Sequence, residues 1–98
     1  MSYQDYRRCG AFICNHVSTR QHPILMATRD TPLEPEDSGW QFLCGTLGHE
    51  SGDACIWMLQ EVVRLDPSLL PILDAEPKSS FRRASIDDSW RSVAYTNE

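Results

Sequence analysis

Cysteine and histidine are the residue types in this chain with the widest range of chemistry. The 98-residue sequence contains four cysteines and three histidines, and two of them, Cys14 and His16, lie two positions apart. A thiolate and an imidazole can both bind zinc, but tight zinc sites usually combine two close ligand pairs, and no second pair follows here. We therefore predict no metal site, and we expect Cys14, Cys44 and Cys55 to be small buried hydrophobic residues.

The same residue types could in principle supply a nucleophile and a general base. Cys14 or Cys44 would be the nucleophile, and the base would be His16, His22 or His49,. No nucleophile elbow surrounds any serine or cysteine, and the sequence has no glycine-rich phosphate loop. The sequence therefore predicts no catalytic residues, no cofactor and no enzyme activity.

Residues 30–39 combine acidic residues, prolines and a glycine. This composition is typical of a loop. Its carboxylates do not follow the spacing of an EF-hand calcium site; they are Asp30, Glu34, Glu36 and Asp37. The two main interpretations of this loop are a solvated acidic surface and a docking site for a partner protein, and a metal site is the third.

The charge balance limits the classes of partner. Fourteen acidic and nine basic residues give a net charge of −5 at pH 7, so the chain should repel a phosphate backbone and attract a basic protein. No stretch approaches the roughly 18 apolar residues of a transmembrane helix, and the apolar run at residues 11–14 is too short for a signal peptide. We therefore expect a cytoplasmic protein that binds neither nucleic acid nor membrane and keeps its cysteines reduced.

Alternating apolar residues and turn residues divide the chain into elements. Residues 11–17 and 23–28 are predicted strands that residues 18–22 join as a hairpin, and three further strands are predicted at residues 40–44, 80–84 and 90–94. Residues 68–74 are apolar but interrupted by a proline, which predicts an irregular segment against the core. The sequence thus predicts a single α+β domain over residues 1–98 with short flexible termini. Its small, mainly antiparallel sheet has about five strands, with one principal helix packed on one face.

That helix is expected from Asp53 to about Leu65, because aspartate suits an N-cap and the following Asp-Pro would end the helix. At about 100° per residue, one face collects apolar side chains, namely Cys55, Ile56, Leu59, Val62 and Val63. Trp57 and Glu61 fall on the outer face. There Trp57 would either contact a partner or be covered by a loop or a chain terminus.

Three stretches carry motifs in a recognisable order: residues 36–45, 64–74 and 79–83. The first contains Asp-Ser-Gly-Trp, the second Asp-Pro followed by Pro-x-Leu-Asp, and the third a Phe-containing strand. In order and spacing they resemble the immunity protein 33 family over residues 10–93. The motif positions are Asp37, Gly39, Trp40, Asp66, Pro67, Pro71 and Phe81. For most of them we expect a structural role, with Trp40 and Phe81 in the core and Gly39 and Pro67 at turns.

The resemblance implies a bacterial immunity protein that neutralises a cognate toxin, and it brings no catalytic residues. The acidic charge suits a basic toxin, and a cytoplasmic location suits a toxin with a cytoplasmic target. The residues expected to contact the toxin are Glu34, Glu36, Asp37, Trp57 and Glu61. The alternative is a housekeeping protein-binding or scaffold module unrelated to toxins. The oligomeric state is left open.

Overall fold

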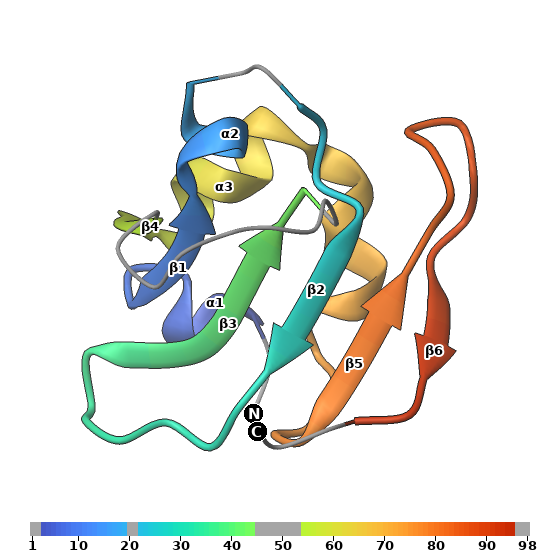
Figure 1. Cartoon of the computed structure of the whole chain (residues 1–98). Coiled ribbons are helices and arrows are strands. Elements are labelled where there is room, and N and C mark those ends of the chain that lie inside the picture. Colours follow the sequence, from blue (N-terminus) through green and yellow to red (C-terminus); the bar gives the residue numbers. More distant parts are fainter. Residues whose placement is uncertain (1–2, 20–21, 45–53, 96–98) are drawn as a thin grey trace.

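Six strands form one mixed sheet in the computed structural model, which describes residues 3–19, 22–44 and 54–95 (Figure 1). The strands are β1 (Gly10–Cys14), β2 (Met26–Arg29), β3 (Asp37–Leu43), β4 (Ala54–Met58), β5 (Ser79–Arg82) and β6 (Arg91–Val93). Their order in the sheet is β4-β1-β3-β2-β5-β6. Strands β1 and β3 are parallel, and the other neighbouring pairs are antiparallel. The sheet is therefore mainly antiparallel, as expected, but it has one strand more than predicted and is mixed.

The helical elements are all short: α1 (Tyr3–Tyr6), α2 (Asn15–Ser18), α3 (Leu59–Leu65) and the 3-10 helix η1 (Pro67–Ile72). Helix α3 and η1 lie on the same side of the sheet (Figure 1). Leu59 and Val62 of α3 and Leu69 of η1 are buried in one core with Trp40 and Phe42 of β3. Two short helices thus replace the single principal helix of the prediction. None of the helices in the described part of the chain is long and apolar enough to span a membrane.

The predicted hairpin between residues 11–17 and 23–28 is wrong. Strand β1 stops at Cys14, and the chain then forms α2. Strand β1 pairs with β3 and β4, whereas β2 pairs with β3 and β5. Strand β3 therefore separates the two expected partners. An alternating pattern shows which face of a strand is apolar, but the choice of neighbouring strand depends on contacts far along the chain.

The predicted start of the helix is also wrong, because residues 54–58 form β4 and α3 begins only at Leu59. Ile56 and Met58 are 65% and 40% exposed, whereas Cys55 and Trp57 pack partly buried against the core. This alternation is that of a strand. Each residue of β4 faces a residue of β1, and this ladder holds the segment extended. The apolar face predicted for one helix therefore combined residues of β4 with residues of α3.

The family-motif residues occupy the core and the connections around it. Trp40 is fully buried and stacks on Phe42 with 5.7 Å between ring centroids, and the partly buried Phe81 packs against the same core. Pro67 begins η1, and Pro71 lies inside it. Gly39 was expected at a turn, but it lies within β3, with φ at 83°. The register between β1 and β3 shifts around this glycine, so the strand itself is distorted there,.

Candidate protein-binding site

A groove of about 440 Å³ lies between residues 33–37 and strands β1 and β4. Its apolar lining comes from Phe12, Leu33 and Ile56, which are 46%, 90% and 65% exposed. Phe12 and Ile56 are cross-strand partners, so their side chains share one face of the sheet,. Glu34, Glu36 and Asp37 line the groove as well, with Arg8 as its basic residue. The result is an exposed apolar surface flanked by carboxylates.

The acidic segment is fixed to the start of β1 by three contacts. The Gly10 backbone N–H donates to the Glu36 carbonyl at 2.6 Å. The Ser38 hydroxyl donates to the Gly10 carbonyl at 2.7 Å, and the Cys9 thiol donates to the Pro35 carbonyl at 3.4 Å. These contacts hold residues 35–38 in place, and a surface held in this way would lose little conformational entropy on binding.

Asp37 holds the acidic segment in its turn. One carboxylate oxygen accepts from the Gly39 backbone N–H at 2.8 Å, and the other accepts from the Leu33 N–H at 3.3 Å. The Glu34 and Glu36 side chains are exposed at the surface. Asp37 therefore positions the loop, while the two glutamates supply its outward negative charge.

Trp57 and Glu61 line a different hollow, together with Arg64 and Leu65. Consecutive side chains of a strand point to opposite faces, so Trp57 faces away from its neighbour Ile56 and from the groove. The Glu61 carboxylate accepts from the Met58 backbone N–H at 3.4 Å and so caps the start of α3,. The structure thus brings Glu34, Glu36 and Asp37 together in the groove. The other two expected contact residues, Trp57 and Glu61, lie in the second hollow.

Phe12, Leu33 and Ile56 were not among the expected contact residues. Phe12 alternates with Ala11 and Ile13, both of which are buried, and this pattern alone would have placed it on the outer face of a strand. Leu33 is a large apolar residue inside an otherwise polar loop, which is also a usable signal. Ile56 was hidden because its segment was assigned to a helix.

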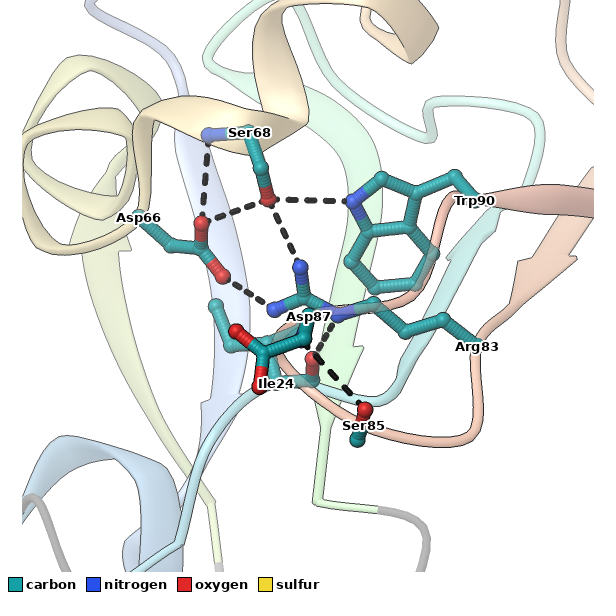
Figure 2. A network of polar contacts seen from close by, with 7 residues as sticks. All are labelled: Ile24, Asp66, Ser68, Arg83, Ser85, Asp87 and Trp90. Atoms are coloured by element: carbon teal, nitrogen blue, oxygen red, sulfur yellow. Dashed lines mark hydrogen bonds and ion pairs between the residues drawn. The ribbon is translucent and has the colours of Figure 1, made fainter.

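A second cluster of polar side chains surrounds Arg83, which is buried in the core region (Figure 2). Its guanidinium donates to the Ile24 carbonyl and the Ser68 hydroxyl, both at 2.9 Å, and it forms an ion pair with Asp66 at 2.5 Å. The Trp90 ring lies 4.4 Å from the guanidinium carbon, and its indole N–H donates to Ser68 at 3.2 Å. Each of the three guanidinium nitrogens of Arg83 thus has a partner within the protein, so this cluster joins elements of the fold. Arg83 and Asp66 also line a hollow of about 380 Å³ beside Ile24.

Two cysteines and a histidine meet at the carboxyl ends of β1 and β3. The ligand atoms of Cys14, Cys44 and His16 all lie within 4.8 Å of one another. Cys14 and Cys44 are 1% exposed, as expected for buried cysteines, while Cys55 is partly buried. Burial raises the pKa of the Cys14 thiol, with further contributions from Cys44. A raised pKa disfavours the thiolate that nucleophilic catalysis requires. His49, the remaining candidate base, lies outside the described residues.

The fold and the groove together define an α+β protein with a preformed, acid-flanked apolar surface of the kind that contacts other proteins. A family model described as the immunity protein Imm33 domain matches residues 11–94. The chain therefore belongs to the Imm33 family of immunity proteins, which confirms the resemblance seen in its motifs. No match was found among curated proteins or among solved structures.

Proposed function

We propose that this protein neutralises a cognate toxin by stoichiometric binding, without catalysis, and that the groove beside β1 and β4 is the centre of the contact surface. The Imm33 family implies a toxin as partner in general terms. The observation that carries the proposal is the group of exposed apolar side chains, Phe12, Leu33 and Ile56, beside Glu34 and Glu36. Isolated apolar residues are common on protein surfaces, but a flanked cluster is typical of an interface.

The apolar residues would supply most of the binding energy. Full burial of one such side chain is worth about 1.5–3 kcal/mol, and a few central residues usually dominate an interface. Glu34 and Glu36 would favour a toxin with a basic surface and would speed its encounter with this acidic protein.

Trp57 and Glu61 fit the same proposal as outer contacts. Within the described residues, β4 pairs only with β1 and so lies at an edge of the sheet. A partner that wraps this edge would contact Ile56 on one face and Trp57 on the other. Such wrapping would also enlarge the interface toward the roughly 1,600 Å² of a stable complex.

The burial of two cysteines supports a non-catalytic mechanism for a protein that we place in the cytoplasm. Cys14 and Cys44 lie close together, and each is 1% exposed. Both thiols are buried, so a substrate would not reach them. A cytoplasmic protector would guard a cytoplasmic target of the toxin.

Co-expression with the product of the neighbouring gene tests the proposal. We expect growth rescue and a complex that co-purifies in one-to-one ratio. Toxicity without rescue or complex would contradict neutralisation and favour the housekeeping-module alternative.

The groove itself is tested with matched variants in the same assay. Ile56→Ser should weaken toxin binding by about 10-fold or more, because an apolar contact is lost from the centre of the interface. Val93→Ser is the control: Val93 is also exposed, but it lies on β6 at the opposite edge of the sheet. Glu34→Gln with Glu36→Gln should also weaken binding at low salt, whereas Glu76→Gln with Asp87→Asn removes the same charge elsewhere. Equal affinities for the groove variants and their controls would reject this surface.

A further inference from the structure

The cluster of Cys14, Cys44 and His16 is built by the parallel pairing of β1 and β3. Cys14 ends β1, Cys44 directly follows β3, and His16 lies in α2 immediately after β1. The carboxyl ends of parallel strands meet at one edge of a sheet, so two cysteines far apart in sequence become neighbours. The two sulfur atoms and a ring nitrogen of His16 all lie within 4.8 Å of one another, and the contact from Cys44 Sγ to His16 Nδ1 measures 3.8 Å.

These separations are close to those of ligands around one metal ion. Zinc binds thiolate sulfur at about 2.3 Å and imidazole nitrogen at about 2.0–2.1 Å, in tetrahedral geometry. Two tetrahedral ligands at those lengths lie about 3.6–3.8 Å apart, so the observed group needs only small side-chain movements to enclose an ion. Thiolate and imidazole are ligand types that suit zinc, whereas magnesium and calcium prefer oxygen ligands.

We propose that Cys14, Cys44 and His16 bind one Zn²⁺ ion, with a fourth position open to water. Binding releases the two thiol protons to solvent and ties α2 to the ends of β1 and β3. The two cysteines are buried, whereas His16 is half-buried and gives access from solvent. The His22 ring meets His16 edge-on, with 5.5 Å between ring centroids, and lies outside the group of three ligands. This proposal is independent of toxin binding.

The spacing of cysteines in the sequence hides this site. Cys14 and His16 form one close pair, but the third ligand comes from 28 residues beyond His16. Zinc sites are usually recognised in a sequence by two close pairs of ligands. Here the pairing of the strands brings a single distant residue, Cys44, to the first pair.

The full chain, reduced with a non-thiol reductant and freed of metal, should bind one Zn²⁺ per molecule in competition with a chromogenic chelator. Co²⁺ as an optical probe should give a thiolate-to-metal charge-transfer band that Zn²⁺ abolishes. Zinc at 100 times its dissociation constant should raise the Tm by about 10 °C, because the folded state alone holds the site.

Cys14→Ser and Cys44→Ser should each weaken zinc binding by more than about 100-fold, since loss of an outer-sphere partner alone costs about 10–100-fold. Cys9→Ser and Cys55→Ser are the matched cysteine controls and should bind as the wild type does. His16→Asn changes a half-buried side chain, so it tests the site even where a buried cysteine variant fails to fold; His22→Asn is its control. Absence of stoichiometric zinc binding by the reduced wild type would overturn the proposal. The proposal would also fail if His16→Asn kept the wild-type circular dichroism spectrum and the wild-type affinity for zinc. An equal loss of zinc affinity in the control variants would count against it in the same way.

Discussion

Gly39 occupies a backbone conformation that residues with a side chain rarely adopt, with φ at 83°. Its carbonyl accepts from the Asp30 backbone N–H at 2.8 Å, which draws the end of β2 against β3. A Cβ atom added at Gly39 would lie 2.2 Å from the Asp30 carbonyl oxygen. The Asp30 carbonyl group and the Arg29 side chain leave no room for a side chain at this position, which gives a structural reason for the glycine of the family motif.

Gly39→Ala should lower the free energy of unfolding by about 3 kcal/mol, from the positive φ and the clash with backbone together. Gly10→Ala is the control. There the added Cβ meets a methyl group of Ile56 at 3.0 Å, and that side chain can move. We expect a loss of about 1 kcal/mol for the control. Urea unfolding followed by circular dichroism measures both, and equal losses would show that the conformation of Gly39 is not the cause.

At the scale of elements, Asp66 connects three parts of the fold. Its backbone N–H donates to the Val62 carbonyl at the end of α3. Its carboxylate accepts from the Ser68 N–H at 3.1 Å and so caps η1, and it pairs with Arg83 just after β5. This residue thus joins the helical layer to the sheet. Strand β5 lies between β2 and β6 in the sheet, and Arg83, which directly follows β5, is buried.

Asp66→Asn should lower the free energy of unfolding by about 3 kcal/mol, because the buried Arg83 would lose its counter-ion. The asparagine can still accept from Ser68, so most of this loss belongs to the ion pair. Asp87→Asn is the control, since Asp87 is exposed on the β5–β6 turn, and it should change stability by less than about 0.5 kcal/mol,. Thermal unfolding compares the two; a loss below about 1 kcal/mol in Asp66→Asn would mean that the pair contributes little.

At the scale of the whole molecule, the net charge of −5 and the acid-flanked groove would both favour binding of a basic partner. Long-range attraction raises the rate at which a basic partner arrives, while burial of apolar side chains slows its departure. The two effects respond differently to salt, because ions screen charges but do not weaken apolar contact in the same way.

The association rate with a basic toxin should therefore fall by about tenfold or more between 10 mM and 500 mM salt, while the dissociation rate changes little. Glu34→Gln with Glu36→Gln should flatten this dependence. Stopped-flow or surface-based kinetics measures both rates. An association rate that does not vary with salt would remove charge attraction from the proposal and leave the apolar contact alone.

The sequence by itself determined the α+β class, the strands near residues 11, 26, 40, 80 and 91, the buried Trp40 and the family. These follow from local alternation, turn residues and short motifs, which act over a few positions. The strand pairing and the whole of β4 were beyond its reach. Residues 54–58 have a pattern compatible with a helix, and only the ladder with β1 makes them a strand.

The candidate sites show the same division. Sequence charge identified the acidic segment, but the tertiary structure placed it beside Phe12 and Ile56 and set Trp57 on another face. Likewise, parallel pairing of β1 with β3 brought Cys44 to Cys14 and His16. Contacts between residues distant in sequence depend on which strands become neighbours, and that choice is made by the packing of the whole chain.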